Sequence, residues 1–406
     1  ERPGRVWLAN PHWGQGEWAQ VAAQCQPDRI IGTVPAGLWR DRPVPTLAPP
    51  PRDGPPRLLI PTGGSSGNIR FASHTWATLR ASVQGFQQHF ACPTVNAYCV
   101  LPLYHVSGLM QAWRCLLSGG QMVIQPFREL LTAGAIAPLP APAFLSLVPT
   151  QLQRLLTSDR DFVPWLQSFT AILLGGAPPW PSLLHQARAL HLPLAPTYGM
   201  TETASQVVTL LPSEFLAGHD SSGRALPHAQ VTIRDGMGQP LPPNQVGRIA
   251  IATPSLAQDY SSPPFYPGDL GSLDEGGYLT VVGRENTLII TGGEKVLPEE
   301  VEAAILKTGL VLDVAVLGLP DRQWGERVGA VVVAAATAEE GLGDRLRAAL
   351  KPQLSPYKIP KHWLVCAELP RNAQGKLNRA TLRQWVGQQW SATTGSERAA
   401  GDGAGE

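Results

Sequence analysis

A run of glycines and hydroxyl-bearing residues follows a short apolar segment in the first quarter of the chain. The apolar residues 58–60 lead through Pro61 into residues 62–67, which read Thr-Gly-Gly-Ser-Ser-Gly. Glycine allows the backbone to approach an anion closely, exposed N–H groups can point at phosphate oxygens, and hydroxyls add donors. These residue types indicate a phosphate-binding loop, although an ordinary surface turn can have the same composition. The loop residues that carry these groups are Thr62, Gly63, Gly64, Ser65, Ser66, Gly67 and, beyond the last glycine, the cationic Arg70.

The elements on either side would position this loop. Residues 58–60 are predicted to form a strand, and residues 72–90 are predicted to form a helix. The glycine loop would then lie at a helix N-terminus, where free backbone N–H groups favour anions. It is not a Walker loop, because no Gly-Lys-Ser/Thr sequence follows the glycines at the required spacing.

Four later segments contain residue types that could take part in the same chemistry. Residues 102–108 place His105 on a turn after a predicted strand, and residues 198–202 end a strand with Tyr-Gly-Met-Thr-Glu. Ligands usually bind at such strand ends in open α/β sheets. Residues 266–269 offer a carboxylate suited to a ribose diol, and residues 370–376 place a lysine beyond a glycine. Each segment alone is more often structural than functional; only their combination in one chain indicates a function.

Predicted strands and helices alternate from residue 58 to about residue 206, which is typical of a doubly wound α/β domain. Short strands and turns follow and indicate a β-rich subdomain. We expect an α/β fold with a large domain over residues 1–285, a small α+β domain over residues 286–390 and a disordered tail over residues 391–406. The other predicted strands are 98–101, 122–124, 143–148, 171–174, 231–233, 248–251, 278–282, 311–317 and 328–334, and the other predicted helices are 17–25, 109–117, 182–190, 298–306 and 344–350.

Composition restricts the class of partner. The chain has 406 residues, enough for two domains and a large core, and its formal net charge is +1. Such an even balance gives no reason to expect nucleic acid or an anionic membrane surface. The five cysteines lie at no metal-ligand spacing, and no stretch has the layout of a signal peptide or a membrane span. We expect a soluble cytoplasmic protein whose partners are small molecules; the oligomeric state is not predicted.

In this order and at these distances, the segments resemble the motifs of the adenylate-forming superfamily, which includes acyl-CoA and aryl-CoA ligases, luciferases and peptide-synthetase adenylation domains. Residues 62–70 resemble its Thr-Ser-Gly-Thr-Thr-Gly-x-Pro-Lys loop, and residues 102–108 are similar to its Pro-Leu-Phe-His motif. The resemblance extends over about residues 58–383. The other matching segments are 175–178 (Gly-Gly-Ala-Pro), 198–202, 268–271 (Gly-Asp-Leu-Gly), 283–286 (Gly-Arg-Glu-Asn), 292–302 and the lysine motif 370–376.

The resemblance implies a ligase that joins a carboxylic acid to coenzyme A in two steps. The carboxylate attacks the α-phosphate of ATP to give an acyl-adenylate and pyrophosphate, and the thiol of coenzyme A then displaces AMP. The implied catalytic residues are Lys376, a cation on the carboxylate and α-phosphate; Glu202, the Mg²⁺ ligand; and His105. The implied ATP-binding residues are the loop residues named above with Gly176, Ala177, Tyr198 (stacked on adenine), Gly199, Thr201, Asp269 (on the ribose hydroxyls) and Arg284.

The sequence departs from the family pattern at four positions. The loop has Ile69 and Arg70 where proline and lysine are usual, and Pro267 stands where threonine is usual. In the family, the small domain turns between the two steps about a hinge that is usually Asp or Lys. The corresponding hinge position in this chain is Asn286.

The segment before the loop points to one branch of the superfamily. Only about sixty residues precede Thr62, fewer than acyl-CoA ligases usually carry, and the loop sequence is eroded. This pattern is similar to the o-succinylbenzoate–CoA ligases of menaquinone and phylloquinone biosynthesis, particularly their short cyanobacterial type. The alternatives are another aryl- or acyl-CoA ligase, an adenylation enzyme that loads a carrier protein, and a non-catalytic nucleotide-binding relative. The joint retention of Glu202, Asp269, Arg284 and Lys376 argues against the last.

Overall fold

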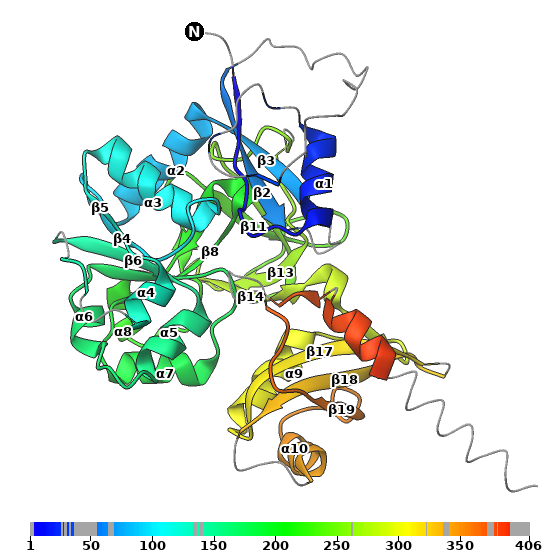
Figure 1. Ribbon diagram of the computed structural model, residues 1–406. Coiled ribbons are helices and arrows are strands. Elements are labelled where there is room, and N and C mark those ends of the chain that lie inside the picture. The colour runs from blue at the N-terminus through cyan, green and yellow to red at the C-terminus, as the bar shows by residue number, and fades with distance from the viewer. Residues whose placement is uncertain are drawn as a thin grey trace, which may run out of the picture.

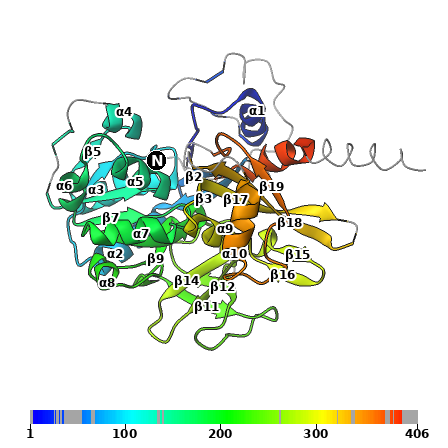
Figure 2. The same ribbon diagram turned by 90° about the horizontal axis from the view of Figure 1, so that it is seen from below.

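A computed structural model gives the structure of the chain, in which a large N-terminal part packs beside a smaller C-terminal part (Figures 1 and 2). Within the described residues, the strands form four sheets. The described residues are 4–25, 27, 31, 34–35, 55–63, 69–132, 136–138, 141–260, 263–321, 323–335, 341–371, 377–379 and 381–389.

A seven-stranded sheet forms the centre of the large part, in the order β10-β9-β8-β7-β6-β4-β5. Strands β4 to β8 are parallel, whereas β9 and β10 continue the sheet in antiparallel pairs. Its strands are β4 (Asn96–Cys99), β5 (Met122–Ile124), β6 (Ala143–Leu147), β7 (Ala171–Leu174), β8 (Leu194–Met200), β9 (Ser205–Thr209) and β10 (Arg224–Ala225). The accompanying helices are α2 (Trp76–His89), α3 (Val106–Ser118), α4 (Phe127–Thr132), α5 (Pro149–Leu156), α6 (Val163–Gln167), α7 (Pro181–Ala189) and α8 (Pro212–Leu216).

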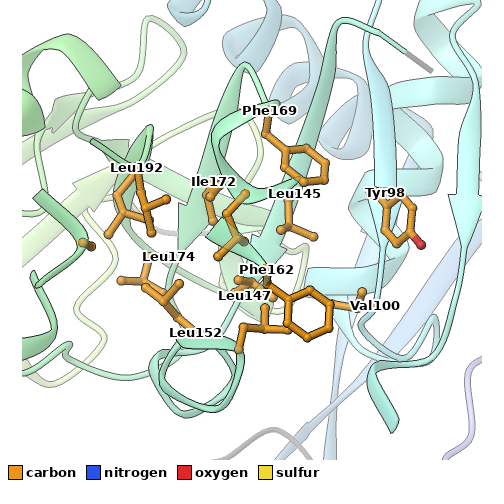
Figure 3. Packing of buried hydrophobic residues seen from close by; sticks show 14 of the residues in the cluster. Tyr98, Val100, Leu145, Leu147, Leu152, Phe162, Phe169, Ile172, Leu174 and Leu192 are labelled. Atoms are coloured by element: carbon orange, nitrogen blue, oxygen red, sulfur yellow. The ribbon is translucent and has the colours of Figure 1, made fainter. Parts of the chain in front are cut away.

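Alternate residues of the parallel strands pack into separate cores on the two faces of this sheet. Leu145 of β6 belongs to a cluster that includes Leu152 of α5 (Figure 3). Its neighbour Phe144 packs instead with Leu173 and with Phe86 of α2. This is the period of two expected for strands covered by helices on both faces. The predicted doubly wound sheet is therefore confirmed, and β5 and β7 have the predicted bounds.

The glycine loop joins two antiparallel strands, so the predicted order of strand, loop and helix is wrong. Strand β2 (Arg57–Gly63) leads into the loop and β3 (Ile69–Thr75) leaves it. Strand β1 (Arg5–Trp7) pairs parallel with β2 to complete a three-stranded sheet, against which α1 (Gln15–Gln24) packs. The described residues on both sides of the loop therefore belong to strands, and the following helix, α2, begins only after β3.

Helix α2 begins after β3, at Trp76. The Thr75 hydroxyl caps it by accepting the N–H of Thr78 at 3.3 Å. The helical pattern predicted for residues 72–90 therefore started too early. Residues 72–75 are buried because they pair with β2 and bond to distant segments, and neither contact is visible in the local sequence.

A four-stranded antiparallel sheet forms the predicted β-rich subdomain. Its order is β11-β12-β13-β14, and Ile249 and Ile251 on it pack with Val207 and Val208 of β9. This packing joins the sheet to the antiparallel edge of the seven-stranded sheet. Its strands are β11 (Gln230–Arg234), β12 (Gly247–Ala252), β13 (Asp269–Leu273) and β14 (Leu279–Arg284).

The last sheet has the order β16-β15-β18-β17, with β19 parallel to β18. Strand β19 and a helix over residues 381–389 follow α10, in a segment where the sequence predicted neither a strand nor a helix. Strand β19 has only four residues, of which three are half-buried and Val365 is exposed, so no alternation of burial marks it in the sequence. The elements are β15 (Ile289–Thr291), β16 (Glu294–Val296), α9 (Pro298–Lys307), β17 (Val311–Asp321), β18 (Gly325–Ala334), α10 (Leu342–Leu350) and β19 (His362–Val365).

A short 3₁₀ turn, η2 (Glu285–Thr287), connects the four-stranded sheet to the last sheet. The predicted hinge residue Asn286 lies in its middle and is exposed. The domain boundary at residues 285 and 286 stays a prediction. None of the helices in the described part of the chain is both long and apolar enough to cross a membrane.

Candidate active site

The Asp269 carboxylate is held by two side chains that are distant in sequence. Arg284 Nε donates to its Oδ1 at 2.7 Å, and the Tyr198 hydroxyl donates to its Oδ2 at 2.7 Å. Asp269 begins β13 and Arg284 ends β14 directly opposite it, while Tyr198 comes from β8 of the other sheet. The Asp269 side chain is only 9% exposed. The structure therefore brings together three residues that the sequence assigned to ATP.

Burial and charge determine that Tyr198 and Arg284 donate these two hydrogen bonds and that Asp269 accepts them. Burial, with a further contribution from Asp269, raises the pKa of Tyr198, so its hydroxyl stays protonated and donates. Burial disfavours the charge on Arg284, but the Asp269 carboxylate outweighs it and leaves the pKa of Arg284 raised. A carboxylate has about four lone-pair sites. One site on each oxygen of Asp269 therefore remains for two further donors, such as a pair of hydroxyls.

A cavity of about 300 Å³ lies next to this cluster. Arg284, Pro267 and Gly268 line it, together with Glu285 and the predicted hinge residue Asn286. Gly268 has a φ of +80°, in the left-handed region that favours glycine, and it leads the chain into Asp269. The space beside the carboxylate is thus bounded both by the β13–β14 strand ends and by the connection between the two parts of the molecule.

Glu202 lies in the 3₁₀ turn η1 (Thr201–Thr203), which follows β8. Burial raises the pKa of Tyr260, Glu202 and Asp259 raise it further, and Arg70 lowers it. The carboxylate of Glu202 and the cation at the end of the glycine loop therefore act on the same hydroxyl. Sequence reasoning did not single out Tyr260, whose segment carries no motif.

Glycines at these strand ends allow a close approach of two strands at Gly199 and a left-handed backbone at Gly176. A Cβ on Gly199 would lie 2.3 Å from the carbonyl oxygen of Ser205 on the neighbouring strand β9. Gly176 follows β7 with a φ of +84°, and Ala177 comes next. Because β7 and β8 are parallel neighbours, their carboxyl ends meet at the same edge. The predicted segments 175–178 and 198–202 are therefore adjacent.

The glycine loop can be followed only at its base. Thr62 pairs with Arg70 across β2 and β3, and Gly63 pairs with Ile69. Arg70 is exposed at this base. The predicted loop residues Gly64, Ser65, Ser66 and Gly67 lie outside the described residues.

His105 is the residue that precedes helix α3, in an extended conformation. Its ring lies edge-on to that of Tyr104, with centroids 4.4 Å apart. A Cβ on Gly108 would lie 2.3 Å from the carbonyl oxygen of Pro102, so glycine is required for this turn. The sequence predicted His105 on a turn after a strand; the structure places it after β4 and directly before α3, which begins three residues earlier than predicted. Its catalytic role stays a prediction.

Lys376 lies outside the described residues, but the two ends of its loop are visible. Arg371 binds Asp313 through two hydrogen bonds of 2.9 and 2.7 Å and forms an antiparallel bridge with Leu377. The Asn378 N–H donates to the Pro370 carbonyl at 2.7 Å. The described residues on either side of the lysine segment therefore lie together, and Arg371 anchors them to Asp313 of β17.

Arg114 of α3 is a candidate residue that sequence reasoning missed. It is 2% exposed, and its Nη2 donates to Ser205 Oγ at 3.1 Å and to Gln206 Oε1 at 2.6 Å. No carboxylate among the described residues pairs with it, and burial lowers its pKa to about 10. Its acceptors on β9 lie opposite Met200 and Gly199 of the predicted ligand-binding strand end. One feature of the sequence could have indicated Arg114: it is the one charged residue in the otherwise uncharged helix α3.

Further polar groups near Arg114 lack hydrogen-bond partners among the described residues. They are the Nε of Arg114, the Nε2 of Gln206 and both ring nitrogens of His228. Burial, and secondarily the charge of Arg114, lowers the pKa of His228 to about 4. The ring occupies space that Gly85 of α2 leaves open, because a Cβ there would lie 1.8 Å from Nδ1. Most of these groups are donors, so the cluster suits an anion.

The sequence matches two family models. The model described as AMP-binding enzyme covers residues 7–261, and the model described as AMP-binding enzyme C-terminal domain covers residues 300–376. The chain belongs to the AMP-binding enzyme family. The adenylate-forming superfamily predicted from the sequence is thereby confirmed, as is an AMP-forming ligase fold with a large and a small part.

Relatives of known name share most of the length of this AMP-binding enzyme. The 2-succinylbenzoate–CoA ligase of Listeria monocytogenes is 31% identical over 347 residues, which cover 79% of this chain and 70% of that protein. The o-succinylbenzoate CoA synthetase of Bacillus subtilis, in complex with the acyl-adenylate intermediate OSB-AMP, is 30% identical with a TM-score of 0.70, over 80% of this chain and 68% of that one. Its complex with ATP and a magnesium ion is 29% identical with a TM-score of 0.69, over 80% and 69%.

Proposed function

We propose that this AMP-binding enzyme is an ATP- and Mg²⁺-dependent acid–CoA ligase that converts 2-succinylbenzoate into 2-succinylbenzoyl-CoA through an acyl-adenylate. The relatives named above carry this activity in their names, and one of them holds the adenylate of the same acid. The product places the enzyme in menaquinone or phylloquinone biosynthesis. All five cysteines are free thiols, which supports a reducing, cytoplasmic location.

The observation that carries the proposal is the geometry around Asp269. Its buried carboxylate keeps one lone-pair site on each oxygen. Its partner Arg284 and its chain neighbour Gly268 line a cavity of about 300 Å³. Two neighbouring hydroxyls of a ribose match two free acceptor sites on one carboxylate. The hydroxyl of Tyr198 binds this carboxylate and so holds the tyrosine ring beside it. In this position the ring would contact the nucleoside. The site thus suits the ribose end of ATP, with Glu202 and Arg70 toward the phosphates.

The proposed reaction proceeds in two steps, adenylate formation and transfer to the thiol. A carboxylate oxygen of the acid attacks the α-phosphorus of ATP, a new P–O bond forms, and the bond to pyrophosphate breaks. The thiol sulfur of coenzyme A then attacks the acyl carbon, loses its proton and displaces AMP. Lys376 would place a fixed cation on the attacking oxygen and the α-phosphate, where charge develops in the first step.

The residues also fit a magnesium ion that arrives with ATP. No group of three His, Cys, Asp or Glu residues within the described ranges could hold a metal by itself. Mg²⁺ is usually bound by one or two carboxylates together with substrate phosphates. Glu202 would be the protein ligand, and the bound ion neutralises negative charge on the phosphates.

The choice of acid is supported by Arg114. Besides the carboxylate that reacts, 2-succinylbenzoate carries a second carboxylate, which needs a cation where it is buried. Arg114 is a buried cation with only neutral acceptors, next to the strand end that carries Glu202. A buried charge is stabilised by a partner of opposite sign. We assign Arg114 to the second carboxylate of the substrate.

The proposed substrate is tested with a panel of acids. With ATP, Mg²⁺ and coenzyme A, 2-succinylbenzoate should give both pyrophosphate and its CoA thioester, far faster than benzoate or palmitate. Arg114→Met should raise the KM for 2-succinylbenzoate by about 10-fold or more, the size of one charged hydrogen-bond contact, and leave the KM for ATP unchanged. Arg80→Met on the exposed face of α2 is the matched control. Equal turnover of a fatty acid would contradict the substrate assignment, and no turnover of any acid would favour the non-catalytic alternative.

A further inference from the structure

His74 connects the strand that leaves the glycine loop with the turn that carries Glu202. It is the sixth residue of β3 and is fully buried. Its Nε2 lies 2.8 Å from the carbonyl oxygen of Thr201, and its Nδ1 lies 3.1 Å from the hydroxyl of Thr78. A carbonyl oxygen can only accept, so Nε2 carries a hydrogen and donates it. Sequence reasoning assigned His74 no role, because residues 72–90 were predicted to be helical.

The contact is part of a junction of three segments. The Glu202 carbonyl accepts the N–H of Ala257 at 2.8 Å, and the Ser73 carbonyl accepts the N–H of Gln258 at 2.8 Å. The Ser73 N–H donates to the Asp259 carboxylate at 2.7 Å. The end of β3, the turn at residues 201–203 and the segment at residues 257–259 are therefore bonded to one another in a closed arrangement.

The hydrogen bond from His74 to the Thr201 carbonyl differs from the other bonds to this turn because a side chain donates it. The other bonds to the 201–202 backbone come from main-chain N–H groups, which most substitutions would leave unchanged. His74 fixes the peptide that immediately precedes Glu202, so it fixes the direction in which the Glu202 side chain leaves the turn. Because β3 starts at the glycine loop, the same bond relates the Glu202 turn to that loop.

We propose that His74 is a positioning residue that holds Glu202 in place for the Mg²⁺ of bound ATP; this rests on the proposed function, which makes Glu202 the metal ligand. His74 touches neither the nucleotide nor the metal. Its effect is on the alignment of the metal-binding carboxylate with the phosphates, and metal sites depend strongly on such outer hydrogen bonds. The ribose end of the site, around Asp269, is held by other residues and does not depend on His74.

The test measures nucleotide binding by calorimetry, with neither acid nor coenzyme A present. The wild-type chain should bind Mg·ATP more tightly than ATP in EDTA. His74→Phe keeps a buried ring but loses both nitrogens, and it should weaken Mg·ATP binding by about 10-fold, the size of one hydrogen bond. Its affinities for AMP and for ATP in EDTA should stay at the wild-type values. His74→Gln keeps an N–H at similar reach and should restore much of the Mg²⁺ effect.

Ser82→Ala is the matched control. The Ser82 hydroxyl donates to the Ala204 carbonyl at 2.7 Å, so its removal loosens the same junction beyond Glu202. It should leave the Mg²⁺ effect intact. The proposal is overturned if His74→Phe binds Mg·ATP normally, if it loses AMP and Mg·ATP affinity equally, or if Ser82→Ala has the same effect. Glu202→Gln in the same assay separates the two claims, because normal Mg·ATP binding by that variant would contradict the proposed function itself.

Discussion

Asp269 and Arg114 are the two buried charges on which the proposed chemistry depends, and their surroundings differ. Asp269 has a cation and a hydroxyl as partners, and two acceptor sites remain free. Arg114 has only neutral acceptors and a ring, that of Phe86, 4.3 Å from its guanidinium carbon. A buried charge without a counter-charge is costly in the free protein. A bound carboxylate offsets that cost, which would make the acid site selective for dianions.

The role of Asp269 is tested by removing its charge. Asp269→Asn should raise the apparent KM for ATP by about 10- to 100-fold, since hydrogen bonds to a charged acceptor are lost. Asp274→Asn makes the same change in the β13–β14 turn, where the carboxylate accepts the N–H of Tyr278, and should have no effect. Steady-state kinetics at varied ATP distinguish the two. An unchanged KM in Asp269→Asn would mean that the ribose binds elsewhere.

His228 makes stability depend on pH. In the folded chain its pKa lies at about 4, while in the unfolded chain it returns to about 6.5. Between these values only the unfolded chain binds the proton, so the free energy of unfolding falls as the pH is lowered from about 6.5 to 4. The contribution of this one residue reaches about 3 kcal/mol.

Urea denaturation at pH 7 and at pH 4.5 measures this contribution. His228→Gln lacks the titrating group, so it should lose less stability than the wild-type chain over the same interval. The buried His74 and the half-buried His89 also have lowered pKa values and act in the same direction in both proteins. The relevant quantity is therefore the difference between the two proteins. Parallel losses would show that His228 is not held neutral in the fold.

At the scale of elements, local periodicity predicted most of the sheet strands, including residues 58–60 of β2, and failed at β3, the second strand of that hairpin. The strands 122–124 and 171–174 were predicted with correct bounds because they are continuous apolar runs flanked by turn residues. Strand β3 contains Ser73 and His74, which are buried through bonds to residues 201, 258 and 259. Such partners lie more than a hundred residues away, so no local pattern could reveal the strand.

The same limit applies to the site. The motifs located Tyr198, Glu202, Asp269 and Arg284 because their spacing resembles a known family. Arg114 and His228 belong to no motif, and an isolated arginine in a helix is usually solvated. Arg114 is buried because its acceptors, Ser205 and Gln206, are brought to it by the pairing of β9 with β8. The surroundings of Arg114 and His228 therefore depend on tertiary contacts, which no local sequence pattern predicts.

The hairpin predicts a distinct role for Arg70. It stands at the base of the glycine loop, exposed and paired with Thr62. Arg70→Ala should raise the apparent KM for ATP by about 10-fold, whereas Arg70→Lys keeps the charge and should raise it less. Arg57→Ala, at the far end of the same hairpin opposite Thr75, is the control. If both alanine variants behave alike, Arg70 is a surface charge and not part of the phosphate site.

At the scale of the whole molecule, the turn η2 joins two sheets that carry different parts of the site. The four-stranded sheet provides Asp269 and Arg284, and the last sheet anchors the lysine loop through Arg371 and Asp313. The connection is short and holds the exposed Asn286. A rotation about this turn would move Lys376 relative to the nucleotide while leaving the ribose site intact.

Two substitutions separate the half-reactions. Lys376→Ala should slow adenylate formation by about 10²- to 10³-fold, the effect of losing one preorganised charge, and should spare thioester formation from prepared acyl-adenylate. Asn286→Pro restricts the turn and should do the reverse, while Asn286→Ala should affect neither step. Circular dichroism verifies that each variant is folded. Equal loss of both steps in folded Lys376→Ala would contradict a rotation between them.

The central claim is that this chain activates an acid as its adenylate and then transfers it to a thiol. The most direct measurement is mass spectrometry of the wild-type chain with ATP, Mg²⁺ and 2-succinylbenzoate, before and after coenzyme A is added. We predict 2-succinylbenzoyl-AMP and pyrophosphate before the addition, and conversion of the adenylate to the CoA thioester and AMP after it. Formation of ADP, or of a thioester with no adenylate preceding it, would contradict the claim.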